Sequence, residues 1–428
     1  MIKIGTGIDV QKLANDHWNW LSKKIRYNED ETVLQNEEPS TSINKILALR
    51  NILGPRVYAR LKEIIVSPLD KLIKLKSDDA DLAKFFPPSK EELDLAKNEY
   101  DEVKQKWQDK LNILKEMGKS DRNYKSVEKE KKTLNDEKKR KKKVFEEQQA
   151  KYDKKYKKYL NTITRKINVV KKEENESLTN GKKKGNKKPS KISVDLEELL
   201  CYGRFHDSAD AWNANVLCDK LKVSVCPYCN RQYISVAEKN GGGWVSSAQI
   251  DHFLPKSMNP LFSCSFFNLI PSCYCCNHGK LDNAAITIYP YTQEFGDDGL
   301  FCLDYIENGG NIDALDLGNL EHMHLHICVS DEALLKDEIN NSISVFHLNE
   351  LYQSHYIEIR DLINRYRCFK KVRLDDCKKL GEALNESDKK KMQDIVLGFP
   401  LGAGDSEYPF RKMKKDLFNQ LKNNDITQ

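Results

Sequence analysis

Apolar residues recur at helical spacing near the start of the chain, over residues 42–75. Gly54 and Pro55 interrupt this run, and the two residues together favour a turn. We therefore predict a helical hairpin whose apolar faces form ordinary core. It belongs to an N-terminal helical region over residues 1–84.

A second helical pattern begins after Ser89, which forms a capping box with Glu92. The apolar positions that follow are spaced by sevens, threes and fours, and they are Leu93, Tyr100, Val103, Trp107, Leu111, Leu114 and Met117. Gly118 ends this arm, and a similar seam continues from Tyr124 to Val170. Such spacing is typical of a coiled coil, so we predict a long antiparallel coiled-coil hairpin over residues 85–174. A seam of this kind could also join two copies of the chain as an oligomer.

Basic residues cluster at two places near this hairpin. Six consecutive cations occupy positions 138–143, and a solvated helix face is a simpler interpretation of them than a phosphate-binding surface. Residues 175–194 are basic and contain almost no apolar side chains. That composition predicts a flexible linker between the hairpin and the rest of the chain.

From position 195 onward, aromatic residues, cysteines and alternating apolar positions occur together, which is typical of a folded domain. We assign residues 195–300 to one domain and residues 301–428 to a C-terminal α/β to helical extension. In the extension, Leu300–Leu303 and Leu325–Val329 are predicted strands, and Asn349–Phe369 is a predicted amphipathic helix. The expected fold class is α+β, predominantly helical.

Composition narrows the class of protein without deciding its partner. The 71 basic and 65 acidic residues of the 428-residue chain leave a net charge of only +6. We find neither a signal peptide nor an apolar run of membrane-spanning length, so we expect a cytoplasmic protein without a membrane partner. Twelve cysteines in a reducing compartment favour metal binding over disulfide bonds.

Four of these cysteines have the spacing of metal ligands. Cys226 and Cys229 form one CxxC pair, and Cys273 and Cys276 form another. Two such turns can present four thiolates tetrahedrally to one ion, so we predict a structural Zn²⁺ site. Cys275 lies inside the second pair and is an alternative ligand, but it does not keep the two-residue gap. A pair of redox-active or buried thiol turns is the other interpretation.

Between and after these pairs lie Asp251-His252, Asn268, and Asn277 followed by Lys280. This order resembles the zinc-bearing HNH (ββα-metal) nucleases. The resemblance implies a ββα-metal domain in which Asp251 and Asn277 bind a catalytic Mg²⁺ or Mn²⁺. It also implies that Asn268 holds the loop that carries the base, through hydrogen bonds to backbone.

The chemistry of phosphodiester hydrolysis agrees with this resemblance. An imidazole has an ordinary pKa of about 6.5, so His252 can take a proton from water near neutral pH, and we assign it as general base. Lys280 lies one helical turn after Asn277, where its ammonium could contact a phosphate, although a solvated lysine is an almost equal alternative. His278 is the second choice after Asn277 as metal ligand.

Within the HNH family, the segments around Cys226, Asp251 and Asn268 look like the PtuB-type nucleases of bacterial Septu and retron anti-phage systems. The resemblance implies a partner ATPase of the ABC or SMC-like kind. It also implies a nucleic-acid substrate, with DNA favoured over RNA, and products with 5′-phosphate and 3′-hydroxyl ends. The coiled-coil hairpin departs from compact members of that group. An RNA-directed HNH nuclease and a non-catalytic zinc-stabilised coiled-coil scaffold are the alternatives.

Three histidines, His322, His324 and His326, alternate along one predicted strand face. Such alternation invites a second metal site. Apart from Glu321, no cysteine or carboxylate motif accompanies them in the sequence. We therefore expect a polar strand face here and not a ligand set.

Overall fold

The chain folds as helices with three two-stranded antiparallel sheets, in the residues that the computed structural model describes. These residues are 2–25, 49–50, 52–117, 121–178, 200, 202–207, 210–305, 323–380, 386–400, 402, 404 and 406–426. None of their helices combines the length and the apolar character that crossing a membrane requires. The expected α+β, predominantly helical fold class is confirmed at this level.

The N-terminal region is helical, as predicted. Its helices are α1 (Val10–Ile25), α3 (Val57–Val66), α4 (Leu69–Asp78) and α5 (Ala80–Ala83). Gly54, with φ +85°, interrupts the helical run at the predicted place. A second interruption was not predicted: α3 ends at Ser67, whose extended backbone precedes Pro68. A residue before proline is disfavoured in helical conformation, so the predicted second helix is two helices.

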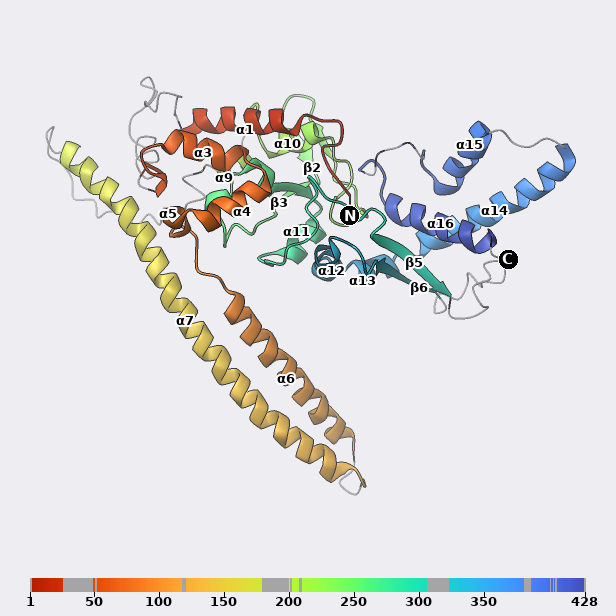
Figure 1. Ribbon diagram of the computed structural model, residues 1–428, viewed down its shortest axis with the longest axis horizontal. Helices are drawn as coiled ribbons and strands as arrows, with labels where there is room; N and C mark the ends of the chain where they lie inside the picture. Colours follow the sequence, from red (N-terminus) through yellow and green to blue (C-terminus); the bar gives the residue numbers. More distant parts are fainter. Residues whose placement is uncertain are drawn as a thin grey trace.

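Two long helices form an arm that projects from the rest of the molecule (Figure 1). They are α6 (Glu91–Glu116) and α7 (Tyr124–Leu178). The Tyr100 and Phe145 rings stack across the pair with centroids 6.2 Å apart. Lys110 and Glu130 form an ion pair of 2.7 Å, also across the pair. These contacts place the two predicted arms side by side as a helical hairpin.

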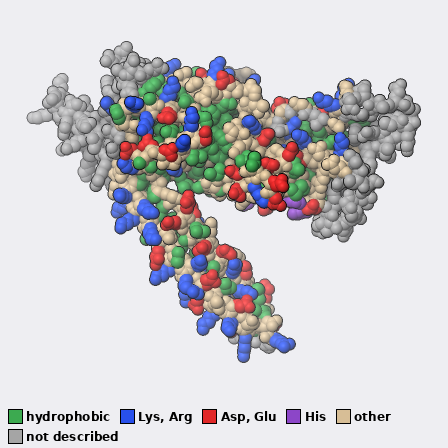
Figure 2. Space-filling model, viewed as in Figure 1, with side chains coloured by type: hydrophobic (Ala, Val, Ile, Leu, Met, Phe, Trp, Pro, Cys, Tyr) green, Lys and Arg blue, Asp and Glu red, His purple; other side chains and the backbone are tan. Residues whose placement is uncertain are grey.

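The run of six cations lies on α7 and is largely engaged in ion pairs. Lys141 Nζ lies 2.7 Å from Glu99 of α6, and Lys142 Nζ lies 3.5 Å from Glu146. Lys138 stands over the Trp107 ring. Figure 2 shows basic and acidic side chains mixed along the arm, which fits the predicted solvated face. Residues 179–194 of the predicted linker lie outside the described residues.

The central part of the chain forms two small sheets and the helices around them. Its elements are α9 (Tyr202–Asp207), α10 (Ala214–Leu221), β1 (Val236–Glu238), β2 (Trp244–Ser246), β3 (Gln249–His252), η1 (Pro260–Phe262), η2 (Phe266–Asn268), β4 (Leu269–Ser272) and α11 (Tyr274–Lys280). β1 pairs with β2, and β3 pairs with β4, both antiparallel. The second hairpin runs directly into α11.

The C-terminal part packs helices against a third hairpin. Its elements are β5 (Gly299–Tyr305), β6 (Met323–Val329), α12 (Lys336–Val345), α13 (Leu348–Gln353), α14 (Tyr356–Leu380), α15 (Glu386–Leu397) and α16 (Arg411–Ile426). Both predicted strands are confirmed. The single predicted helix over Asn349–Phe369 is wrong, because a turn at Ser354 and His355 separates α13 from α14.

One apolar core joins the N-terminal, central and C-terminal parts. The buried cluster extends from Ile4 to Leu421 and crosses the predicted boundaries at residues 84, 195 and 300. It leaves out the buried residues of α6, which are Leu93, Ala96, Val103 and Leu114. Most of the arm is therefore packed on its own seam, and Tyr159 of α7 packs against the core. The other parts stabilise one another through this shared core.

His17 of α1 joins three segments inside this core. Its Nε2 lies 2.9 Å from the carbonyl oxygen of Cys264, and the indole N–H of Trp212 donates to its Nδ1 at 2.9 Å. A neutral imidazole with its proton on Nε2 satisfies both bonds. Burial lowers the pKa of His17 to about 4. The folded state therefore holds this side chain neutral at pH values where an unfolded chain binds a proton.

We expect His17 to make stability depend on pH in the acid range. Above about pH 6.5 the His17 side chain is neutral in both the folded and the unfolded state, so it does not affect stability. Between pH 6.5 and pH 4 only the unfolded chain binds a proton at this side chain. The free energy of unfolding therefore falls, by about 3 kcal/mol in total. His17→Gln keeps a donor and an acceptor but does not titrate. Urea unfolding between pH 7 and pH 4 should show a smaller loss of stability for His17→Gln than for the wild type. His347→Asn, a change at an exposed histidine, is the control, and equal losses for all three proteins would contradict the assignment.

Candidate functional site

Four cysteines converge where the first CxxC turn meets the start of α11. The first turn is closed by a hydrogen bond from the Asn230 amide to the Cys226 carbonyl at 2.8 Å, with Asn230 in the left-handed region at φ 49°. Cys273 is the N-cap residue of α11. All four thiols are buried, and Cys275 is exposed. The structure thus brings together the four predicted ligands and leaves out the alternative.

The spacing of the sulfur atoms suits a tetrahedral metal ion. The ligand atoms of Cys226, Cys229, Cys273 and Cys276 all lie within 4.8 Å of one another. A Zn–S bond is about 2.3 Å long, which sets about 3.8 Å between the sulfurs of a tetrahedral site. The observed distance between Cys229 Sγ and Cys273 Sγ is 3.9 Å. The cluster can therefore hold a metal such as zinc.

Burial and the neighbouring thiols shift the pKa values of these cysteines in opposite directions. A hydrogen bond from Cys226 lowers the pKa of Cys229 well below its usual value, whereas burial raises the pKa of Cys226. Thiolate is the form that binds metal, and a divalent cation compensates the charge that burial disfavours. A metal bound by this cluster would consequently also stabilise the packing of this corner.

The C-terminal extension holds the first cysteine turn in place. The Tyr352 hydroxyl donates to the Cys229 carbonyl at 2.5 Å, and the Phe410 amide donates to the Asn230 carbonyl at 2.6 Å. The Tyr228 ring stacks on Phe346 with centroids 4.5 Å apart. These contacts are long-range in sequence, and the motif spacing gives no sign of them.

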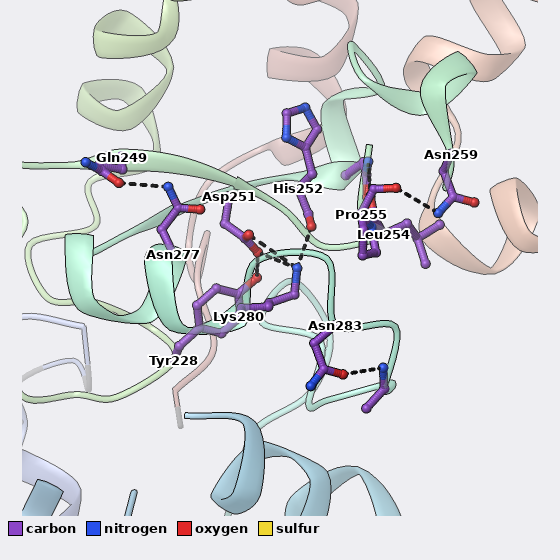
Figure 3. A network of polar contacts seen from close by, with 12 residues as sticks. Tyr228, Gln249, Asp251, His252, Leu254, Pro255, Asn259, Asn277, Lys280 and Asn283 are labelled. Carbon is purple, nitrogen blue, oxygen red and sulfur yellow. Dashed lines mark hydrogen bonds and ion pairs between the residues drawn. The ribbon is translucent and has the colours of Figure 1, made fainter. Parts of the chain in front are cut away.

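The strand β3 carries Asp251 and His252 at its end. In the β3–β4 register, Asp251 is opposite Ile270 and His252 is opposite Leu269. The two side chains point to opposite sides of the strand, with Asp251 towards α11 (Figure 3). The period of a strand dictates this for adjacent residues. The HNH resemblance implies a turn here that would bring both side chains to one side, but both residues stay in regular strand pairing with β4.

Asp251 is buried and engaged by two partners. The Tyr228 hydroxyl donates to its Oδ2 at 2.6 Å, and Lys280 Nζ lies 3.0 Å from Oδ2 and 3.2 Å from Oδ1. Lys280 Nζ also donates to the His252 carbonyl at 2.6 Å. The Lys280 side chain is 1% exposed, so the expected phosphate-facing position is wrong. Its ammonium instead compensates the Asp251 carboxylate inside the protein.

This arrangement does not fit a Mg²⁺ or Mn²⁺ ion as it stands. The cation beside the Asp251 carboxylate is the Lys280 ammonium (Figure 3). The side-chain amide of Asn277 donates to the Gln249 side-chain oxygen at 2.7 Å. Hard divalent cations need several converging oxygen ligands and water, and Asp251 here has an ammonium and a phenol against it.

His252 lies on the other side of β3 with its ring fixed by backbone. Its Nε2 lies 2.9 Å from the Ser263 carbonyl oxygen, which places the proton on Nε2 and leaves Nδ1 as the acceptor nitrogen. Burial, with a contribution from Lys256, lowers the pKa of His252 to about 4. The ring centroid is 4.7 Å from that of Tyr202. The imidazole is therefore neutral at neutral pH.

Asn268 makes the backbone hydrogen bonds that the resemblance implies. Its Oδ1 accepts from the Leu254 amide at 2.7 Å, and its Nδ2 donates to the carbonyls of Leu254 at 3.2 Å and Phe262 at 3.0 Å. The side chain is fully buried. It ties together the two ends of the loop that follows His252.

Three residues of this site were not identified from the sequence. They are Tyr228 as a partner of Asp251, Gln249 as the partner of Asn277, and Ser263 as the acceptor for His252. Lys280 was identified, but in another role. Strand alternation could have indicated Gln249, which shares a face with Asp251 two residues away. The sequence shows that Tyr228 lies inside the CxxC turn, but it does not show that the hydroxyl points to Asp251.

A cavity of about 370 Å³ opens beside Gln249 and Ile250 of β3, and neither Asp251 nor His252 lines it.

Loss of one cysteine ligand should release the metal and loosen the central part of the chain. We expect Cys276→Ser to bind no zinc at this cluster and to lose much of the stability that a structural zinc provides, which is on the order of 10 kcal/mol. Cys275→Ser changes an exposed thiol in the same turn and should keep both metal and melting temperature. Metal analysis with thermal melting tests this, and a Cys276→Ser protein that retains the metal would contradict it.

Lys280→Gln should reveal whether Asp251 can bind a divalent cation. Removing one member of a buried ion pair typically costs about 3–5 kcal/mol, so the melting temperature should fall in the presence of EDTA. If the Asp251 carboxylate of Lys280→Gln binds Mn²⁺ in the folded state, Mn²⁺ should raise the melting temperature of this variant. The rise should be larger than for the wild type and for Lys220→Gln, the control at an exposed lysine. An Mn²⁺ effect no larger than in the controls would leave Asp251 a purely structural residue.

A scan against protein-family models, a search of the curated proteins and a search of the solved structures found no match for this chain. The likeness to HNH nucleases therefore rests on the motif residues. The function has to be inferred from those residues and their geometry.

Proposed function

We propose that this chain is a metal-dependent HNH endonuclease that hydrolyses phosphodiester bonds, with DNA as the first substrate to test. One observation carries the proposal: a four-cysteine cluster fixes an antiparallel hairpin and the following helix, and the first strand of that hairpin ends in Asp251-His252. Asn268 supports the loop after His252, as an HNH site requires. The order of these parts is the one that the HNH resemblance implies.

His252 is suited to act as the general base. Its Nε2–H is held by the Ser263 carbonyl, so the ring is oriented and Nδ1 can accept the proton of an attacking water. A pKa of about 4 keeps the ring neutral and ready to accept a proton at neutral pH. Such a low value also weakens it as a base, so a neighbouring phosphate that raises the pKa would favour the reaction.

One cationic group lies near His252 at the end of β3. This group is Lys256, whose Nζ is 5.4 Å from the centroid of the Tyr202 ring, whereas the buried Lys280 is already paired with Asp251. A phosphodiester that approaches His252 could therefore contact the Lys256 ammonium. Positive charge at this place supports an anionic substrate.

The catalytic Mg²⁺ or Mn²⁺ and the product ends belong to the same proposal. For Asp251 and Asn277 to bind that ion, Lys280 has to leave the carboxylate, whereas Asn277 can offer its Oδ1 while its Nδ2 still donates to Gln249. A bound divalent ion would offset charge at the leaving oxygen. The anti-phage role and an ATPase partner rest on the likeness of the motif segments to PtuB-type nucleases.

A non-catalytic scaffold is the second candidate, and two observations favour it. Asp251 is compensated by a buried lysine, and His252 is only 8% exposed. In this alternative the zinc cluster stabilises the fold, and the α6–α7 arm is the working part. The two candidates differ in whether His252 affects any reaction.

A nicking assay separates these candidates. Supercoiled plasmid is incubated with wild type, His252→Ala and the control His347→Asn, with Mg²⁺, Mn²⁺ or EDTA, and a parallel series uses RNA. We expect metal-dependent cutting that falls by about 10²- to 10⁴-fold in His252→Ala and is unchanged in His347→Asn. Two results would favour the scaffold. One is that His252→Ala cuts as well as the wild type. The other is that neither nucleic acid is cut in a metal-dependent way even when ATP and a partner ATPase are added.

A further inference from the structure

The hairpin of β5 and β6 has one buried face and one open face. Phe301 and Leu303 of β5 and Met323, Leu325 and Ile327 of β6 are buried. The alternating residues therefore share the opposite face, and these are Leu300, Cys302, Asp304, His324, His326 and Cys328. Figure 2 shows histidine side chains at the surface where β6 lies. Most groups on this open face are metal-ligand types.

Asp304, His324 and His326 come together on this face. Asp304 is directly opposite His324 in the register, and Cys302 is opposite His326. One ligand atom from each of the three residues lies within 4.8 Å of the others. The two imidazole rings stack with centroids 5.2 Å apart and an interplanar angle of 25°. Two strands distant in sequence thus supply a carboxylate and two imidazoles to one point.

His326 offers a ligand nitrogen without a hydrogen-bond partner. Its Nδ1 is buried and takes part in no hydrogen bond. The nearest carboxylate oxygen, Oδ2 of Asp304, lies 3.5 Å away. In a tetrahedral zinc site with bonds of about 2.0–2.1 Å, neighbouring ligand atoms are about 3.3–3.4 Å apart. The observed separation is close to this value. A metal ion between the two atoms would satisfy the nitrogen and the carboxylate together.

The other nitrogen of His326 has a partner that orients the ring. Nε2 lies 3.2 Å from Cys328 Sγ. Metal-ligating histidines commonly use their second nitrogen in this way, which fixes the tautomer and directs the first nitrogen to the ion. With the proton on Nε2, the lone pair of Nδ1 points towards Asp304 and is available for a metal.

Side-chain amides hold the backbone beneath this cluster. The Gln420 side chain accepts from the Leu303 amide at 3.0 Å and donates to its carbonyl at 2.8 Å. The Gln353 side chain accepts from the Leu325 amide at 2.8 Å and donates to the Met323 carbonyl at 3.0 Å. Each glutamine replaces a neighbouring strand at one edge of the hairpin. The ligands consequently stand on a fixed surface, which lowers the cost of assembling a metal site.

We propose that Asp304, His324 and His326 form a second metal site, separate from the four-cysteine cluster, for a borderline transition metal of the Zn²⁺ class. Two nitrogens and one oxygen suit Zn²⁺, Ni²⁺ or Cu²⁺, whereas Mg²⁺ requires more oxygen ligands. Three protein ligands leave a fourth position open to water or to a donor from another molecule. The site does not depend on the proposed nuclease function.

This proposal reverses the expectation from the sequence, which favoured a polar strand face. The expectation rested on the absence of a carboxylate or cysteine near the histidines. Asp304 and Cys302 are about 20 residues away in the chain, and they reach the cluster only because β5 pairs with β6 in the observed register. His322, the third histidine of the pattern, lies outside the described residues.

Metal stoichiometry tests the second site directly. Full-length protein is equilibrated with Zn²⁺ by dialysis under reducing conditions, and bound zinc is measured by elemental analysis. We expect two zinc ions per chain in the wild type and one in Asp304→Ala and in His324→Ala. The exposed residues Asp331 and His347 supply the controls Asp331→Ala and His347→Asn, which should keep two.

Cobalt spectroscopy assigns each ion to its site. Co²⁺ at the four-cysteine cluster should give the intense near-ultraviolet bands of thiolate ligation, and the second equivalent should add only weak visible bands, which Asp304→Ala and His324→Ala should lose. Because both ligands are exposed, the variants should keep the wild-type melting temperature in EDTA. One zinc ion per wild-type chain, or a second ion that survives both substitutions, would overturn the proposal.

Discussion

The arrangement of the central part of this protein depends on four buried sulfur atoms that converge on one point and can share one metal ion. The Cys226 turn and the start of α11 are distant in sequence, and the cysteine cluster joins them. The hairpin of β3 and β4 is only four residue pairs long, too little to be stable alone. The cluster at one end and the Asp251–Lys280 ion pair in the middle both hold α11 against this hairpin. These two links position Asp251 and Asn277, whereas His252 and Asn268 are held by hydrogen bonds to backbone.

Charge compensation also explains why the site has two distinct sides. On the α11 side of β3, Asp251 is paired with a buried lysine and a tyrosine hydroxyl, which makes a closed polar network. On the other side, His252 is neutral and bonded to backbone. The first side resembles structural support, and the second offers a group that can accept a proton. A nuclease reaction at this place requires the closed side to open to a cation, whereas a scaffold would keep it closed.

The sequence predicted those features that depend on spacing along one segment. The ligands Cys226 and Cys273 follow from the CxxC gap, and the two arms follow from the apolar period. The support by Asn268 was implied by the HNH resemblance. Features that depend on contacts across the fold were missed or predicted wrongly. Lys280 was placed facing phosphate because helical spacing alone does not show that it is buried, and Asp304 was overlooked because strand register brings it to His324.

The most direct test of this account is hydrogen exchange of β3, β4 and α11, measured with stoichiometric zinc and after zinc is removed by a chelator. We expect removal of zinc to accelerate exchange strongly in these three elements, while the α6–α7 arm keeps its protection. Unchanged exchange in β3, β4 and α11 after complete loss of zinc would contradict the claim that the four sulfurs hold this unit together.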